Sequence, residues 1–352
     1  MKYFAGLFAA ALLLSCAKEN SNKNNYKPQF TSVTATTLHE QENIGVRAIT
    51  IDDDNVYYAG SNGNFGFMPI AGGKSLSGIV SKDTLYPEFR SIAQTKDAVF
   101  ILNAGTPALL YKITKDGKHS KLVYTETGEK VFYDSMKFRN DKEGIAIGDP
   151  VNECLSVIVT NDGGDTWKKL SCIKLPTVAE GEAAFAASNT NIVLRGDKTW
   201  IISGGKKSRV FYSESKCENW QVSDTPILQG DAPAGMFSVD FYDDEVGFAV
   251  GGDYTDVKGN KANKILTEDG GRTWNKMADG VGFGYASCVQ FVPDSDGNGL
   301  VTAGPSGLWY SYDRGSTWKK IYDDTKLHTL RFVDSKTAIA AGQNKIIRLN
   351  FK

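Results

Sequence analysis

An eight-residue pattern that recurs in the second half of the chain constrains the fold more than any other feature. Segments 160–167, 267–274 and 311–318 fit Ser/Thr-x-Asp-x-Gly-x-Thr-Trp without exception, and segment 213–220 is a degenerate copy. The pattern suits the turn of a β-hairpin, because Asp caps backbone N–H groups, Gly adopts a positive φ and Trp packs back over the turn. Each copy therefore predicts a hairpin, and its carboxylates are too few for a calcium loop.

A second repeat lies between these hairpins. It comprises seven short segments, 47–51, 90–94, 134–138, 182–186, 237–241, 287–291 and 328–332. Their second residue is small and their third is apolar, which suits innermost strands that crowd around an axis. The units lie roughly 40 to 55 residues apart, the spacing of a four-stranded blade. The repeat predicts an all-β, seven-bladed β-propeller, with six blades as the alternative because the first two units lack the hairpin pattern.

The two ends of the chain are expected to meet. The last unit has too few residues for a complete blade, since the chain ends at Lys352. Residues 29–38 have the composition of a strand with no partner of its own. We expect this N-terminal strand to become the outer strand of the last blade, which closes the ring and removes exposed sheet edges.

The repeats carry a resemblance to a known family. With the motifs Gly-Asp-Pro at 148–150, Gly-Glu-Ala-Ala-Phe-Ala-Ala-Ser at 181–188 and Gly-Gly-Asp-Tyr at 251–254, the chain resembles the BNR-repeat (Asp-box) propellers related to the photosystem II assembly and stability factor. The resemblance implies a seven-bladed propeller that binds partners and has no settled catalysis. Sialidases and sortilin-like receptors carry the same hairpin, so the resemblance leaves the function open.

The N-terminus is typical of an exported lipoprotein. An apolar run from residue 4 to 14 follows Lys2 and is too short to span a bilayer. It ends in Leu-Leu-Ser-Cys, which resembles a bacterial lipobox and makes Cys16 the predicted lipidation site. We expect a signal peptide at 1–15, a lipidated, flexible tether at 16–27 and the propeller at 28–352. Ala17 favours an anchor at the outer membrane or cell surface over the inner membrane.

Charge and residue counts exclude several functions. Forty basic and 41 acidic residues provide no field for nucleic acid. Three scattered histidines do not predict a metal site. No dinucleotide fingerprint precedes a helix, so no cofactor is expected. We expect a monomer, tethered to a membrane by its lipid, that binds an envelope protein or a glycan.

The first residue of each inner-strand unit predicts a binding site. This position lies at the mouth of a propeller's channel, and around the ring it reads Arg47, Arg90, Asp134, Glu182, Phe237, Ser287 and His328. Arginines and acids fall in adjacent pairs, which predicts a basic arc and an acidic arc. Such a mouth suits a ligand with an anionic end and hydroxyl or cationic groups. A solvated ring of salt bridges without a ligand is the alternative.

A catalytic interpretation uses two of the same residues. Asp134 and Glu182 on adjacent blades would supply the carboxylate pair of a glycoside hydrolase. A sialidase-like enzyme also needs three arginines, and only Arg47 and Arg90 are placed for this role. Binding is therefore the favoured function, and a glycoside hydrolase is the alternative.

The cysteines predict one disulfide. Cys154 and Cys172 flank the hairpin at 160–167, and with a turn centred on residue 163 they face each other across its strands. The compartment outside the cytoplasm permits the bond. Cys217 replaces a glycine of the hairpin pattern and Cys288 lies on an inner strand, so both are expected to be free thiols.

Overall fold

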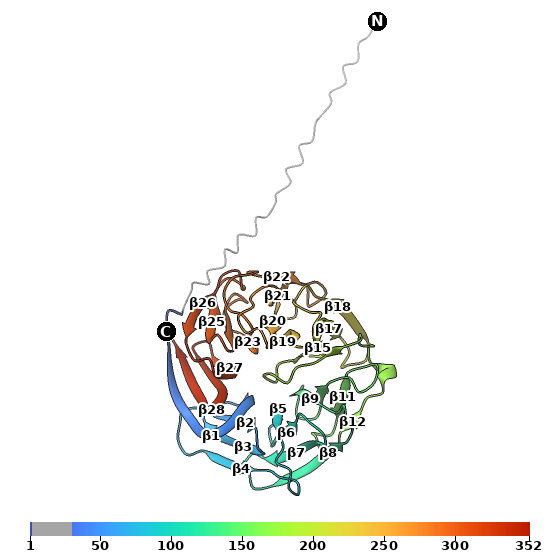
Figure 1. Cartoon of the computed structure of the whole chain (residues 1–352), viewed down its shortest axis with the longest axis vertical. Coiled ribbons are helices and arrows are strands. Elements are labelled where there is room, and N and C mark those ends of the chain that lie inside the picture. The colour runs from blue at the N-terminus through green and yellow to red at the C-terminus, as the bar shows by residue number, and fades with distance from the viewer. Residues whose placement is uncertain (2–29) are drawn as a thin grey trace.

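The computed structural model describes Met1 and residues 30–352. Residues 30–352 form a ring of antiparallel β-sheets around a central axis (Figure 1). The predicted signal peptide, Cys16 and the tether lie outside the described residues. The described part contains no α-helix, only the 3₁₀ turn η1 (Cys172–Lys174). Within it, therefore, no helix has the length and apolar character needed to cross a membrane.

Four of the sheets have four strands each. The first contains β5 (Phe89–Gln94), β6 (Ala98–Asn103), β7 (Ala108–Thr114) and β8 (Ser120–Glu126). The second contains β9 (Tyr133–Phe138), β10 (Gly144–Gly148), β11 (Ser156–Thr160) and β12 (Lys168–Lys169). The third contains β14 (Ile192–Arg195), β15 (Lys198–Ile202), β17 (Arg209–Ser213) and β18 (Trp220–Asp224). The fourth contains β23 (Cys288–Phe291), β24 (Leu300–Ala303), β25 (Leu308–Ser311) and β26 (Lys319–Tyr322).

The other two sheets have six strands each. One contains, in spatial order, β27 (Leu327–Asp334), β28 (Thr337–Phe351), β1 (Val33–Ile51), β2 (Asn55–Gly60), β3 (Asn64–Pro69) and β4 (Leu76–Ile79). The other contains β13 (Glu182–Ala183), β16 (Gly204–Gly205), β19 (Ala234–Phe241), β20 (Gly247–Asp253), β21 (Lys264–Thr267) and β22 (Asn275–Lys276).

The prediction of seven blades is wrong, because the described residues form six hydrogen-bonded sheets and the molecule is a six-bladed propeller. The physical reason is strand β1, which is continuous over 19 residues. Its first part pairs with β28 and its second part pairs with β2. The first and last sequence units therefore belong to one six-stranded sheet, and the alternative of six blades agrees with the sheet count.

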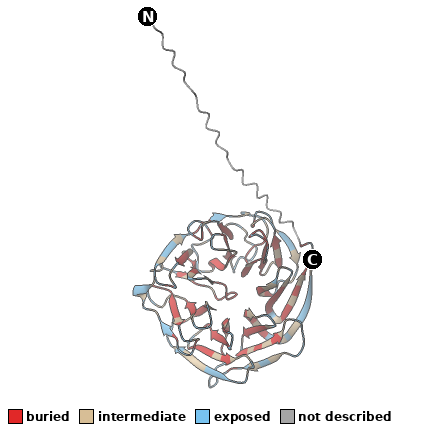
Figure 2. Cartoon of the chain, turned by 180° about the vertical axis from the view of Figure 1, so that it is seen from behind, coloured by how far each residue is buried: buried red, intermediate tan, exposed pale blue. Residues whose placement is uncertain are grey.

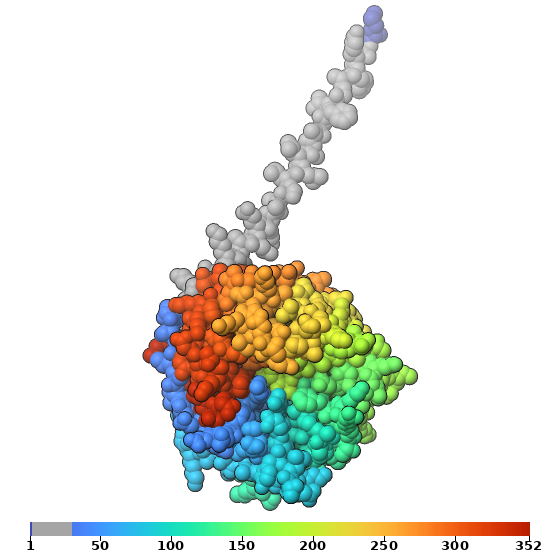
Figure 3. Space-filling view, viewed as in Figure 1, coloured from blue at the N-terminus to red at the C-terminus, as the bar shows by residue number. Residues whose placement is uncertain are grey.

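The predicted closure by an N-terminal strand is confirmed. Val33 pairs with Phe351, and the ladder continues to Gly45 opposite Gln343. Figure 3 shows the N-terminal residues in blue beside the C-terminal residues in red. This pairing joins the two ends of the chain, so that neither β1 nor β28 leaves an unpaired edge there.

The patterned hairpins have the predicted turn chemistry. In the first, the Asp162 carboxylate accepts hydrogen bonds from Thr166 N at 3.0 Å, Thr166 Oγ1 at 2.6 Å and Thr160 Oγ1 at 2.8 Å. The same three bonds recur at Asp269 and Asp313. Hydrogen bonds from Thr166 lower the pKa of Asp162 to about 2, because they stabilise its charged form. The aspartates therefore hold the turns.

Each patterned turn also packs against the preceding sheet. Gly164, Gly271 and Gly315 have φ values of 78°, 88° and 81°. A Cβ atom at any of these positions would lie 2.2 to 3.2 Å from an aromatic ring of that sheet. These rings are Phe100, Trp200 and Phe248. Glycine is needed at these positions for two reasons: the backbone has a positive φ, and neighbouring sheets approach too closely for a side chain.

The hydrophobic core lies between adjacent sheets. One cluster joins Phe100 and Leu102 of β6 to Met136 of β9 and Trp167 after β11. Figure 2 shows buried residues on the inner strands and exposed residues on the outer strands. The ring therefore holds its inner strands rigidly around the axis, where their first residues can form a site.

Candidate binding site at the channel mouth

β-Bulges place the first residues of the inner-strand units. In five units the register between the first and second strands skips one residue, namely Arg47, Arg90, Asp134, Phe237 and His328. A bulge leaves its extra residue unpaired and redirects that residue's side chain. The repeat seen in the sequence is thus a repeat of bulged positions at one end of the inner strands.

The channel itself is filled by residues 187–190, which we call the axial segment. The Asn189 amide donates to Ile92 O at 2.7 Å and accepts from Met136 N at 2.9 Å. Thr190 Oγ1 donates to Ser238 Oγ at 2.8 Å, and Thr329 Oγ1 donates to Ser188 O at 3.1 Å. The axial segment therefore connects inner strands from several sheets and closes the channel.

This closure explains the small second residue in six of the seven units; the exception is Ala183, which lies on β13 and is only partly buried. The six residues are fully buried around the axial segment, and several of them hydrogen-bond to it through a hydroxyl group; they are Ala48, Ser91, Ser135, Ser238, Cys288 and Thr329. The prediction of crowding around an axis is confirmed, with the difference that a segment of the same chain occupies the axis.

A cavity of about 630 Å³ lies above the axial segment, at the bulged end of the strands. Its volume is in the range of ligand-binding pockets. Five of the seven predicted mouth residues line it: Arg47, Arg90, Phe237, Ser287 and His328. Asp149, Phe185, Tyr254 and Tyr285 also line it and were not predicted as site residues. Asp149 was visible in the sequence only as part of the Gly-Asp-Pro motif.

The two arginines dominate the charge of the mouth cavity. Burial and the neighbouring Arg90 lower the pKa of Arg47, which has no ion pair among the described residues. Arg90 contacts Glu88 at 3.3 Å. Burial, reinforced by both arginines, lowers the pKa of His328 to about 3, so this imidazole is neutral at physiological pH. Burial raises the pKa of Tyr285 to about 12. The cavity therefore presents two arginine cations and two neutral side chains, together with the carboxyl group of Asp149.

An aromatic wall stands beside the arginines. The rings of Phe185 and Phe237 stack with centroids 3.9 Å apart, and Tyr285 meets Phe237 edge-on at 4.8 Å. Tyr254 packs edge-on against both phenylalanines and is half exposed. The cavity thus suits an anionic group carried on an apolar body.

Asp134 lies beneath the mouth cavity and does not line it. Its side chain is fully buried, and both of its carboxylate oxygens lack a hydrogen-bond partner among the described residues. Burial, together with Asp149, raises the pKa of Asp134 well above its ordinary value, although Arg90 opposes the shift. Burial therefore disfavours the charged form of Asp134, which is enclosed close to the site.

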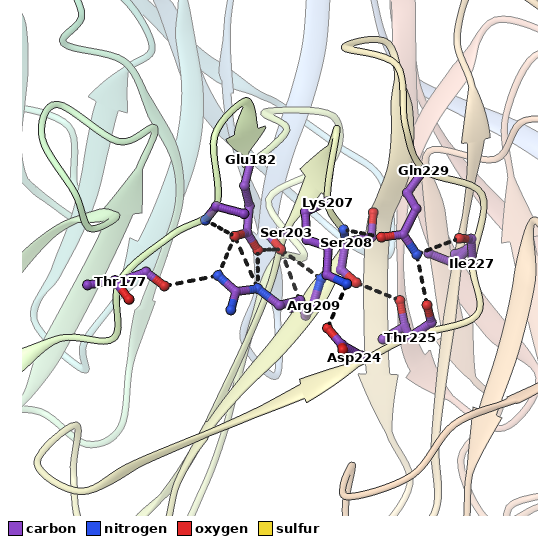
Figure 4. A network of polar contacts seen from close by, with 11 residues as sticks. Thr177, Glu182, Ser203, Lys207, Ser208, Arg209, Asp224, Thr225, Ile227 and Gln229 are labelled. Atoms are coloured by element: carbon purple, nitrogen blue, oxygen red, sulfur yellow. Dashed lines mark hydrogen bonds and ion pairs between the residues drawn. The ribbon is translucent and has the colours of Figure 1, made fainter.

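The placement of Glu182 on an inner strand is wrong. The inner strand of its unit is β14, whereas Glu182 lies on β13 and pairs with β16. Its buried carboxylate accepts hydrogen bonds from Arg209 Nε at 3.1 Å, from Ser203 Oγ and from Ala179 N at 2.8 Å (Figure 4). Residues 182–186 match the unit in sequence, but the chain then crosses the axis. The acidic arc predicted at the mouth is consequently absent from the described cavity.

The structure joins Cys154 and Cys172 by a disulfide with Cα atoms 5.5 Å apart. The predicted register differs by one residue, since Ile158 faces Lys169 in the ladder between β11 and β12. The bond forms beyond the end of that ladder, at Cys172 as the first residue of η1, where the strands no longer dictate the pairing. Cys217 and Cys288 are buried and free.

The comparisons support the fold. No family model and no curated protein matches the sequence. The structure of YCF48 bound to D1 peptide matches with a TM-score of 0.65 and 14% identity, over 92% of this chain and 98% of that chain. YCF48 from Cyanidioschyzon merolae matches with a TM-score of 0.65 and 11% identity, over 90% and 98%. A streptogramin B lyase matches with a TM-score of 0.68 and 13% identity, over 93% and 100%. The chain is therefore a β-propeller that resembles YCF48 in fold.

Proposed function

We propose that this chain is a membrane-tethered, extracytoplasmic β-propeller that binds a segment of a partner protein in the mouth cavity. The observation that carries the proposal is the pair Arg47 and Arg90, set beside an aromatic wall in a cavity that the axial segment closes. A carboxylate attached to an apolar residue would satisfy both features. YCF48, a structural neighbour, has been solved with a bound peptide, which supports a protein ligand over a glycan.

The cellular context is part of the same proposal. The lipobox ending at Cys16 supports a lipid anchor, and the Cys154–Cys172 disulfide fits a compartment outside the cytoplasm. The recurring turn chemistry at Asp162, Asp269 and Asp313 supports assignment to the BNR-repeat propellers. The role we infer is assembly or scaffolding within the cell envelope.

The glycoside hydrolase alternative loses its geometric basis. The reaction needs two carboxyl groups on opposite sides of one sugar. Asp134 is enclosed beneath the mouth cavity, and Glu182 is held by Arg209 outside it. No observation therefore favours this function.

The double substitution Arg47→Ala/Arg90→Ala tests the proposed function. We expect at least a tenfold loss of partner capture from an extract of the cell's own envelope. The melting temperature should stay within about 2 °C of the parent. Within residues 30–352, Arg47 has no ion pair and donates only one long hydrogen bond, to Ala187 O at 3.3 Å, and the ion pair of Arg90 is partly exposed. Quantitative mass spectrometry of cross-linked partners and thermal unfolding provide the measurements.

Arg195→Ala/Arg272→Ala is the matched control, because both of these arginines form exposed ion pairs away from the mouth. Equal capture by the parent and the mouth variant would refute the site. Capture on a glycan array that depends on the mouth arginines, without any protein partner, would replace the protein ligand by a glycan.

A further inference from the structure

A second cavity adjoins the mouth cavity and extends it toward the rim. Its volume is about 680 Å³, and it lies between the loops that contain residues 129–132, 149–153 and 178–183. Phe132, Asp149 and Ala183 line both cavities. The two cavities therefore form one continuous groove, which we call the radial groove, from the channel axis to the edge of the ring.

The charge of the side chains that line the radial groove changes from positive to negative along its length. Its axial end holds Arg47 and Arg90, whereas its outer end holds three acidic side chains, Glu129, Glu153 and Glu180, against one lysine, Lys130. Glu129 and Glu153 have no ion pair among the described residues, and Glu180 approaches Lys206 only at 4.0 Å with its side chain 97% exposed. These carboxylates are available to a ligand.

Glu182 does not contribute to this charge pattern, although it lines the outer cavity. Arg209 pairs with its carboxylate, and the side chain is fully buried (Figure 4). Between the charged ends, Val131, Phe132, Pro150 and Val178 supply an apolar surface. The groove is thus cationic at the axis, mainly apolar in the middle, where Asp149 supplies one carboxyl group, and anionic at the rim.

The axial end of the groove is closed by the axial segment, so a bound chain enters from the rim and stops at the arginines. We propose that the radial groove binds an extended peptide with a carboxylate at the axis and lysine or arginine side chains toward the rim. This inference rests on the proposed function and specifies the class of its ligand. Complementary charges at both ends would set the register in which the peptide binds and would select the partner.

Peptides that carry the charges separately test the inference. The probes are dye-labelled octapeptides with two aspartates at one end, two lysines at the other and Ala-Leu-Leu-Ala between them. The set includes versions with Lys→Ala, with Asp→Asn and with both changes, each as a free acid and as a C-terminal amide. Fluorescence anisotropy with the full chain gives the affinities. We expect the bipolar peptide to bind at least tenfold tighter than either single-charge version.

Variants of the protein assign each end of the peptide. Glu153→Gln/Glu180→Gln should reduce the gain in peptide affinity that the lysines confer to less than twofold. The gain in affinity that the aspartates confer should stay intact. Arg47→Ala/Arg90→Ala should reduce the gain in affinity from the aspartates to less than twofold and leave the gain from the lysines intact. Glu40→Gln/Glu42→Gln, which alters two exposed acids of β1, is the matched control and should change neither gain.

The outcomes separate the inference from the function on which it rests. One outcome is binding that depends on the aspartates and the arginines but does not change when the lysines or the groove glutamates are replaced. This outcome overturns the bipolar groove and keeps the proposed function. Failure of every peptide to bind overturns both. A loss on amidation identifies a chain-terminal carboxylate at the axis, whereas equal binding of acid and amide identifies an aspartate side chain; both results support the groove.

Discussion

At the scale of single residues, burial decides which ionisable groups carry charge. His328 and Arg47 occupy equivalent bulged positions and line the same cavity. Burial beside two arginines nevertheless lowers the pKa of His328 to about 3. Asp149 faces the same cavity, and burial raises its pKa to about 6, although a hydrogen bond from Ala184 N opposes the shift. The site is therefore sensitive to pH through Asp149, while His328 stays neutral.

Asp149 should link stability to pH. Its pKa is higher in the folded than in the unfolded chain, so the folded state binds more protons between about pH 4 and 6, and stability falls as pH rises through this window. We expect Asp149→Asn to lessen that fall by about 2 kcal/mol. Urea unfolding at pH 4, 5, 6 and 7 measures the effect. Parallel stability curves for the parent and the variant would show that Asp149 titrates normally.

At the scale of elements, the axial segment is buried and hydrogen-bonded like a part of the protein core, although it has the backbone of a loop. Its side chains and carbonyl groups take part in hydrogen bonds with β5, β9, β19 and β27. Arg331 adds two donors to the carbonyl groups of Ser188 and Asn189 at 3.1 and 3.2 Å. Buried polar groups that are satisfied in this way specify one arrangement, because every alternative leaves some of them unpaired. The inner strands therefore share a common central partner.

Asn189→Ala should destabilise the propeller by about 3 kcal/mol or more, because three buried groups lose a partner and alanine takes a φ of 59°. Asn189→Gly relieves the backbone cost and should recover only a small part of the loss. Asn161→Ala, at an exposed turn position, is the control and should change stability by less than about 0.5 kcal/mol. Denaturant unfolding measures all three, and a mild effect of Asn189→Ala would show that the axial segment is not a structural centre.

At the scale of the whole molecule, the fold depends on contacts between distant parts of the chain. β1 joins β28 across more than 300 residues of sequence, as the pairing of Val33 with Phe351 shows. This closure places Val33, at the start of β1, beside the last residues of β28 and away from the residues that line the mouth cavity. The proposed lipid anchor and the proposed binding site therefore depend on different parts of the chain.

Cys16→Ala should release the protein from membranes without changing its fold or its ligand affinity. In the proposed lipoprotein this thiol is the attachment point for the lipid, and stable anchoring requires more than one acyl chain. Membrane fractionation and metabolic lipid labelling measure the effect, with thermal unfolding as the control for folding. Native levels of membrane retention in this variant would refute the lipoprotein assignment.

The sequence by itself determined the local chemistry of the propeller. The patterned hairpins, the small second residues and the first residues of the units are visible because each depends on a short segment whose residues satisfy one another. Five of the seven mouth residues followed from that periodicity, and so did the flanking positions of Cys154 and Cys172. Local patterns of this kind survive in sequence because turn geometry and strand crowding restrict residue types directly.

The tertiary structure alone decided how these units combine. No local signal shows that β1 is continuous and merges the first and last units into one sheet. Residues 182–186 fit the inner-strand pattern, yet the chain uses them to approach the axis, because Glu182 pairs with Gly205 of β16 on another sheet and Arg209 binds its carboxylate. The predicted acidic arc is missing from the part of the mouth that the structure describes because Glu182 lies on that other sheet and Asp134 is buried outside the cavity, whereas Asp149 entered the site through folding. These features depend on partners far away in sequence, and a repeat pattern carries no information about such partners.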